Sequence, residues 1–266
     1  MESLKLIEKY NDIYQDGKEN FHTFPLDDIY QEVFSFIQLY IKGKSVLELG
    51  SGDGTFVLDY LSKEAKEIFA IDFSSIGIEK SRKRMLKENK DNCEFIECDL
   101  NNIDDKLSIH LDFDAIVSIG VIEHLDDPSI IFKIARDRLL PNGYLFLNHP
   151  HFLNLRGLVW KALEIFCNAK MSLTDKHTIL PDYIFSLAEN YGFKIETVKT
   201  IRQSVGMGKD MLKDYNKRLR KAMIYLPDID KKVDEFLNFL DLTANPKIMT
   251  GTVLSGSEII WRFKKI

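Results

Sequence analysis

Residues 46–56 read Val-Leu-Glu-Leu-Gly-Ser-Gly-Asp-Gly-Thr-Phe, and this stretch decides the fold of the chain. Its first four residues predict a short buried strand, and the apolar residues after Thr55 predict a helix. The intervening glycines, Gly50, Gly52 and Gly54, allow positive φ angles and a close approach of the backbone to a ligand. A helix that starts here directs free N–H groups toward a nucleotide-like or carboxylate-bearing ligand. A single turn of this kind is also compatible with a purely structural role.

The spacing of the glycines bears on which ligand the turn would hold. The dinucleotide fingerprint has glycine at the third position of G-x-G-x-x-G, where this chain has Thr55. Instead the glycines alternate, and an acid, Glu48, lies in the strand two residues before the first of them. Asp72 ends the next predicted strand, residues 68–72, and follows Gly52 by 20 residues. A carboxylate at that strand tip can accept hydrogen bonds from both hydroxyls of a ribose.

Apolar strands of four to six residues alternate with helical runs from residue 44 onward. This alternation predicts right-handed crossovers and a parallel sheet that helices cover on both faces. In addition to the two strands above, we expect strands at 94–98, 114–119, 144–147, 194–201 and 258–263. We expect the last of these to be antiparallel and to lie at the edge of the sheet. Asp27 is a plausible N-cap of a helix over 27–41, and Pro128 is expected to begin another helix.

Five motifs occur in order: E-L-G-S-G-D-G at 48–54, A-I-D at 70–72, E-C-D-L at 97–100, F-D-A-I-V-S-I-G-V-I-E-H-L at 113–125 and L-L-P-N-G-Y-L at 139–145. With this order and spacing, the chain resembles the class I S-adenosylmethionine-dependent methyltransferases. It is most similar to their small-molecule group, which includes the ubiquinone-type O-methyltransferases. The resemblance is close over residues 44–150 and looser over 177–200. It implies an α/β three-layer sandwich with a Rossmann-like, mostly parallel seven-stranded sheet and an antiparallel last strand.

The resemblance also implies how a single methyltransferase domain, residues 1–266, would be divided. Residues 1–43 would form an N-terminal helical lid, although their aromatic side chains could equally cap the core. Residues 204–256 predict two helices, 209–225 and 228–242, which would cap the active site or form a homodimer contact. The other expected segments are the cofactor-binding core at 44–150, the acceptor-pocket segment and sixth strand at 151–203, and the last strand at 257–266.

The resemblance assigns residues to S-adenosylmethionine. Glu48 would fix the amino end of its methionine part, and Asp72 would hold the ribose with Phe73 beside the adenine. Asp99 would accept a hydrogen bond from the adenine amino group, while Leu100 would offer a backbone contact. The residues expected to line the methionine part and the sulfonium are Gly50, Ser51, Gly52, Ser118 and Gly120.

Methyl transfer from a sulfonium is an in-line displacement in which alignment can lower the barrier by about 7–11 kcal/mol. An alcohol or protonated amine acceptor would also need a base. We expect His177, His124 or His151 in this role, although His124 could equally pack the loop after the fourth strand. We expect no metal, because one Glu beside one His supplies too few ligands. The side chains expected to bind the acceptor are Tyr14, His149, His151 and His177.

Composition narrows the class of protein. The net charge of −5 argues against a general nucleic-acid binder, which needs a basic face. Cys93, Cys98 and Cys167 have no C-x-x-C spacing and are expected to be reduced thiols of a cytoplasmic protein, with Cys98 in the core. We expect no membrane span and no signal peptide. The basic helix 209–221 could steer an anionic acceptor, but a solvated helix face is favoured.

The sequence therefore supports an S-adenosylmethionine-dependent methyltransferase that acts on an O or N atom of a small molecule. Two alternatives stay open. One is a non-catalytic S-adenosylmethionine binder or partner subunit that would use residues 205–256 as its interface. The other is a protein or RNA methyltransferase, which suits the basic helix but not the overall charge.

Overall fold

The computed structural model describes residues 2–16, 25–100, 112–172, 174–243 and 255–266. Parts of the predicted lid and of the predicted insertion, residues 17–24 and 244–254, lie outside the described residues. The chain folds into two compact units. The first comprises Met1–His149, Pro181–Val198 and Ile260–Ile266, and the second comprises Pro150–Leu180 and Lys199–Ile259.

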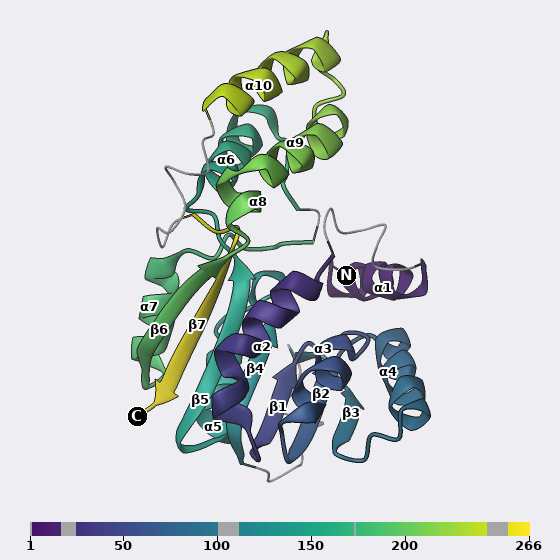
Figure 1. The fold of residues 1–266 in the computed structure, drawn as a ribbon, viewed down its shortest axis with the longest axis vertical. Helices are drawn as coiled ribbons and strands as arrows, with labels where there is room; N and C mark the ends of the chain where they lie inside the picture. Colours follow the sequence, from purple (N-terminus) through teal and green to yellow (C-terminus); the bar gives the residue numbers. More distant parts are fainter. Residues whose placement is uncertain (1, 17–24, 101–111, 173, 244–254) are drawn as a thin grey trace. The chain divides into compact units, whose positions relative to one another are not determined.

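A seven-stranded sheet has the strand order β3-β2-β1-β4-β5-β7-β6 (Figure 1). The central strand β1 is buried and pairs in parallel with β2 on one side and with β4 on the other. The chain thus builds the sheet outward from β1 in two directions, and the strand order reverses between β1 and β4. In open α/β sheets such a reversal opens a ligand crevice at the carboxyl ends of the strands. The strands are β1 Ser45–Leu49, β2 Glu67–Asp72, β3 Cys93–Glu97, β4 Phe113–Ile119, β5 Leu139–Pro150, β6 Phe193–Ile201 and β7 Glu258–Lys265.

The last strand is antiparallel, as expected, but its predicted place at the sheet edge is wrong. β7 lies between β5 and β6, and the Ile266 N–H at its end donates to the Gly192 carbonyl just before β6. Ile260 and Phe263 are fully buried, so an apolar strand of this kind needs neighbours on both sides. β6 is the edge strand, and most of its residues are at least partly exposed to solvent.

Helices pack around the sheet in the first unit: α4 contacts β2 and β3, and α2 and α5 contact β4. Cys98 is buried beside β3, as expected, and all three cysteines are free thiols. The first-unit helices are α1 Glu2–Asp16, α2 Asp27–Ile41, α3 Thr55–Asp59, α4 Ser75–Lys87, α5 Ile130–Arg138 and α7 Pro181–Asn190, with 3₁₀ turns η2 Leu61–Lys63 and η4 Ile122–His124. The second-unit helices are α6 Leu155–Cys167, α8 Gln203–Met207, α9 Lys209–Ala222 and α10 Ile229–Thr243.

Three details of the predicted elements need correction. Asp27 is not the N-cap of α2: Leu26 occupies that position, and Asp27 lies in the first turn, where its charge complements the helix dipole. Pro128 precedes α5, which begins at Ile130 after a turn. The strand predicted at 144–147 is longer than expected, because β5 begins at Leu139, and it is irregular in its pairing with β4.

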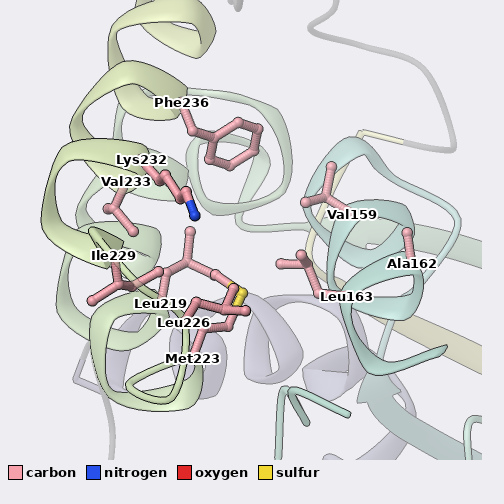
Figure 2. A pocket seen from close by; sticks show the side chains of 10 residues that line it. All are labelled: Val159, Ala162, Leu163, Leu219, Met223, Leu226, Ile229, Lys232, Val233 and Phe236. Carbon is pink, nitrogen blue, oxygen red and sulfur yellow. The ribbon is translucent and has the colours of Figure 1, made fainter. Parts of the chain in front are cut away.

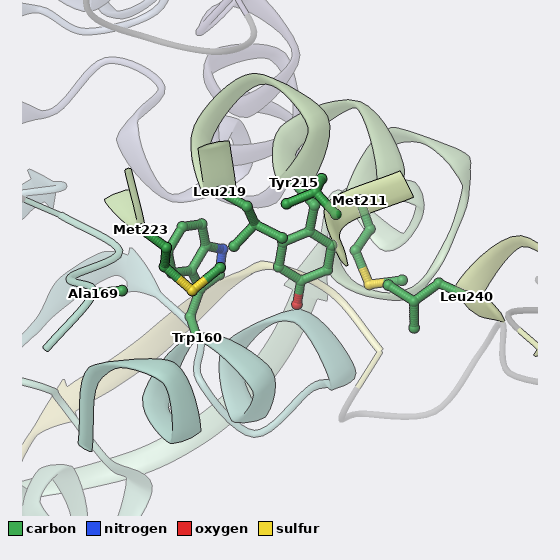
Figure 3. Close-up of a cluster of buried hydrophobic side chains, with 8 residues drawn as sticks. Trp160, Ala169, Met211, Tyr215, Leu219, Met223 and Leu240 are labelled. Atoms are coloured by element: carbon green, nitrogen blue, oxygen red, sulfur yellow. The ribbon is translucent and has the colours of Figure 1, made fainter. Parts of the chain in front are cut away.

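The second unit has its own core, in which α6, α9 and α10 pack together (Figure 3). A buried ion-pair network runs through it. Asp214, 1% exposed, accepts hydrogen bonds from Arg156 Nε at 2.8 Å and Arg218 Nη1 at 3.2 Å. It also accepts one from Trp160 Nε1 at 3.3 Å, and the Arg218 guanidinium lies 4.9 Å from the centre of the Trp160 ring.

The prediction that the basic side chains of helix 209–221 form a solvated face therefore holds for only some of them. Lys213 and Lys217 are exposed, whereas Arg218 is held in the network around Asp214. Arg220 pairs with two carboxylates of α10, on Asp230 and Asp234. The sequence pattern could not distinguish the exposed cations from the paired ones, because the partners of the paired cations lie on other turns and other helices.

We expect Asp214→Asn to lower the free energy of unfolding by about 3 kcal/mol, because it leaves two guanidinium charges without their buried partner. Burial by itself would raise the pKa of Asp214, but Arg156 and Arg218 outweigh it and hold that pKa below its usual value. The stabilisation should therefore be complete above about pH 4 and be lost as the pH falls further.

Chemical denaturation at pH 7 measures this change. The matched control is Asp210→Asn, on the same helix, which removes an exposed pair with Lys213 and should cost about 0.5 kcal/mol. Equal losses in the two variants would contradict a structural role for the buried network.

Candidate active site

The turn after β1 is tied to the neighbouring strand β2. The N–H groups of Gly50 and Ser51 both donate to the carbonyl of Ile71, at 2.8 and 2.9 Å. The φ angles of Gly50, Gly52 and Gly54 are +80°, +58° and +73°. Only glycine adopts such angles without strain, so the alternating glycines are what allow the chain to turn here.

Space around the turn also requires glycine. A Cβ atom on Gly50 would collide with the side chain of Val121, in the loop that follows β4. A Cβ atom on Gly52 would lie 2.5 Å from the hydroxyl oxygen of Tyr14, on helix α1. Other chain segments thus approach this backbone too closely for any larger residue.

The carboxylate of Asp72 lies directly against the glycine turn. Its Oδ2 accepts a hydrogen bond from the Gly52 N–H at 2.8 Å, and its Oδ1 accepts one from the Ser74 N–H at 2.8 Å. The side chain is buried at the end of β2, where its two backbone donors fix its orientation. Asp72 and the glycine turn, which the sequence predicted to form one site, are adjacent in the structure.

Polar side chains lie buried in this part of the first unit. Glu48, Ser51 and Ser118 are all buried, and the strand register places Ser118 beside Leu49. Within the described part of the chain, the hydroxyl oxygens of Ser51 and Ser118 have no hydrogen-bond partner. Buried polar atoms are normally satisfied, so these two hydroxyls fit a polar ligand at the ends of β1 and β4. The residues present therefore suit the methionine part of S-adenosylmethionine.

Helix α1 packs on this region through contacts with the start of α4. The Ser74 hydroxyl donates to Asn11 Oδ1 at 2.6 Å, and the Lys80 ammonium donates to the carbonyl of Tyr14. The ring of Tyr10 packs edge-on against Phe73, with ring centres 5.5 Å apart. Burial, together with the nearby charge of Asp72, raises the pKa of Tyr14, so its phenol stays protonated at neutral pH.

His124 lies in the same aromatic cluster. Its ring centre is 5.7 Å from that of Tyr10, and its Nε2 is 3.8 Å from Glu123 Oε1. Glu123 is buried, and a Cβ atom on Gly120 would lie 3.7 Å from the same oxygen. The turn after β4 therefore places a histidine, with a carboxylate next to it, against the same Tyr10 ring that packs on Phe73.

The remaining predicted cofactor residues lie at the end of β3. The strand register places Asp72 opposite Glu97, and the Cys98 N–H donates to the Asp72 carbonyl at 2.8 Å. Asp99 and Leu100 follow immediately, and Leu100 is buried. Both residues thus continue from the strand next to Asp72, in the same unit as the glycine turn.

The other predicted histidines are distributed over both units. His149, in the first, is buried, and its Nε2 accepts a hydrogen bond from Trp261 Nε1 at 3.1 Å. His151, in the second, is also buried, and its Nε2 has no hydrogen-bond partner among the described residues. Burial lowers the pKa of His151, which keeps the ring neutral at pH 7. His177 is half-buried in the second unit.

Sequence reasoning missed the polar contacts that hold α1. Asn11 is 63 residues from Ser74, and Lys80 is 66 residues from Tyr14. Because the two partners of each pair are so far apart, no local sequence pattern predicts that they will meet.

Over residues 2–16, 25–100, 112–172, 174–243 and 255–266, no group of three or more His, Cys, Asp or Glu side chains is arranged to hold a metal ion. None of the helices in the described ranges has the length and apolar character needed to cross a membrane.

Comparisons with known proteins show the family to which the chain belongs. Residues 41–217 match the family described as "Methyltransferase domain". The chain is 26% identical over 146 residues to the "Probable cobalt-precorrin-6B C(15)-methyltransferase (decarboxylating)" of Methanocaldococcus jannaschii, a match that covers 52% of this chain and 75% of that protein. It is 22% identical over 108 residues to the ubiquinone biosynthesis O-methyltransferase of Acinetobacter baumannii, which covers 41% of this chain and 44% of that enzyme. The chain thus matches less than half the length of the second relative.

Solved structures share the fold. An S-adenosylmethionine-dependent methyltransferase of Thermotoga maritima has a TM-score of 0.60 at 14% identity, covering 98% of this chain and 100% of that chain. The N-methyltransferase NodS of Bradyrhizobium japonicum, solved with S-adenosylhomocysteine, has a TM-score of 0.52 at 12% identity, covering 88% and 86%. These likenesses confirm the predicted fold class.

We expect Asp72→Asn to weaken binding of S-adenosylhomocysteine by about tenfold to hundredfold, because a charged hydrogen bond contributes roughly 1.5–3 kcal/mol. Titration calorimetry measures the change. The matched control is Glu67→Gln at the opposite end of the same strand, which should bind like the wild type. Equal affinities of Asp72→Asn and wild type would contradict the assignment of this carboxylate.

Proposed function

Because the chain belongs to the methyltransferase domain family and uses S-adenosylmethionine, we propose that it methylates an oxygen or nitrogen atom of a small-molecule acceptor. The observation that carries this proposal is the cradle formed by the glycine turn and the Asp72 carboxylate, which are joined through the Gly52 N–H. The net charge of −5 supports a small acceptor over a nucleic acid.

The side chains around the cradle would bind the ribose, the adenine and the methionine part of the cofactor. Asp72, held by two backbone donors, would accept from the ribose hydroxyls. Phe73 and Asp99 would contact the adenine, and the buried hydroxyls of Ser51 and Ser118 would face the methionine part. When bound, S-adenosylmethionine supplies an activated methyl group on a sulfonium, so the protein has mainly to align the acceptor.

We assign the proton transfer to His124. A neutral imidazole can take the proton of an acceptor hydroxyl or ammonium, and the Glu123 carboxylate, 3.8 Å away, would stabilise the resulting imidazolium. Its contact with Tyr10, which also packs against Phe73, supports this choice. His151 and His177 stay predictions as alternative bases and, together with Tyr14 and His149, as contacts of the acceptor. The division of the chain into lid, core, acceptor segment and cap also stays a prediction.

The reaction can be tested with methyl-labelled S-adenosylmethionine and a panel of phenols, aliphatic alcohols and amines, with mass spectrometry of the products. For an acceptor that is methylated, His124→Asn should lower kcat by about 10²–10⁴-fold, the usual contribution of a general base. Glu123→Gln should lower it less, because this variant keeps the imidazole.

Calorimetric affinity for S-adenosylhomocysteine is the control for both variants and should stay unchanged. Turnover by His124→Asn at the wild-type rate would contradict the assignment of His124 as the base. Absence of labelled product from every acceptor class, despite intact cofactor binding, would count against the proposed O- or N-methylation.

A further inference from the structure

The second unit contains an apolar pocket that shares no residue with the cofactor cradle. Its volume is about 220 Å³, and it lies between α6, α9 and α10 (Figure 2). Each helix contributes apolar side chains: Val159 and Leu163 come from α6, Leu219 from α9, and Val233 and Phe236 from α10, while Met223 follows the end of α9 directly. The pocket thus differs in chemical character from the polar cradle of the first unit.

Lys232 is the charged side chain among those that line the pocket, and its nitrogen is directed toward the space between the helices (Figure 2). No carboxylate of a described residue pairs with its ammonium group. The neighbouring Lys231, by contrast, lies 4.0 Å from the Glu235 carboxylate. An unneutralised cation beside an apolar cavity attracts a ligand that combines an apolar body with a negative charge.

The volume sets the size of such a ligand. An apolar cavity of about 150 Å³ in a protein core stays dry and binds benzene, so this pocket has room for a somewhat larger hydrocarbon group. It is smaller than the roughly 300–1,000 Å³ of sites for drug-sized ligands. A single aliphatic chain of medium length satisfies both limits, whereas the paired chains of a phospholipid do not.

We propose that this pocket binds a free amphipathic anion, with a single aliphatic chain between α6, α9 and α10 and a carboxylate or similar head group at Lys232. The inference does not rest on the acceptor proposed above. Cradle and pocket are built from different residues, so Asp72→Asn should lose cofactor affinity and keep affinity for the anion.

The full-length chain can be titrated with decanoate at pH 7 by calorimetry. We expect saturable binding with a dissociation constant near or below about 1 mM. Ala162 lines the pocket from an exposed position, so Ala162→Phe should fill the cavity without disturbing the core and weaken binding at least about tenfold. Ile165→Phe, on the same helix but outside the lining, is the matched control and should bind like the wild type.

A second pair of variants tests the head group. Lys232→Gln should weaken decanoate binding about threefold to fivefold, as expected for an exposed ion pair, and should leave binding of neutral 1-decanol unchanged. Lys231→Gln, the adjacent lysine, should change neither ligand.

Three results would overturn the inference. The first is no saturable decanoate binding by the wild type, and the second is wild-type affinity in Ala162→Phe. The third is co-sedimentation of the wild type, but not of Ala162→Phe, with phosphatidylglycerol vesicles, which would assign the pocket to bilayer lipid. If neither the wild type nor any variant binds S-adenosylhomocysteine while the wild type binds decanoate, the proposed function is contradicted and this inference is still supported.

Discussion

Two backbone N–H groups hold the carboxylate of Asp72 against the glycine turn, and the candidate site depends on this arrangement. The donors belong to Gly52, before α3, and to Ser74, before α4. They come from two different strand-to-helix connections, so the carboxylate joins the turns after β1 and β2, next to the reversal of strand order between β1 and β4. Without the Asp72 carboxylate, the N–H groups of Gly52 and Ser74 would lose the acceptor that holds them in this orientation.

The rest of the first unit supports this contact. β1 is buried and paired on both sides, which fixes where the turn begins. Positive φ angles at Gly50 and Gly52 let the backbone itself face the proposed ligand site. The side chains of Val121 and Tyr14 occupy the space that a larger residue at either position would need. Buried serine hydroxyls and an aromatic cluster around Tyr10 then give the space polar and apolar sides.

Much of this could be predicted from the sequence, because the succession of strands and helices along the chain, the glycine turn and the strand-end acids are local patterns with regular spacing. The position of β7 inside the sheet was missed, since an apolar strand reads the same at an edge and in the interior. The buried charge of Asp214 and the bonds from Lys80 and Ser74 to helix α1 were missed for a different reason. The partners Asn11 and Tyr14 on α1, and Arg156 for Asp214, lie far away in the sequence, so no local periodicity predicts these contacts.

The most direct measurement is a crystal structure of the full chain with S-adenosylhomocysteine. We expect the two ribose hydroxyls to lie within about 3 Å of the Asp72 carboxylate oxygens, with the amino acid part over the turn from Gly50 to Gly52. Density for the ligand away from that turn, or a ribose that makes no contact with Asp72, would contradict it.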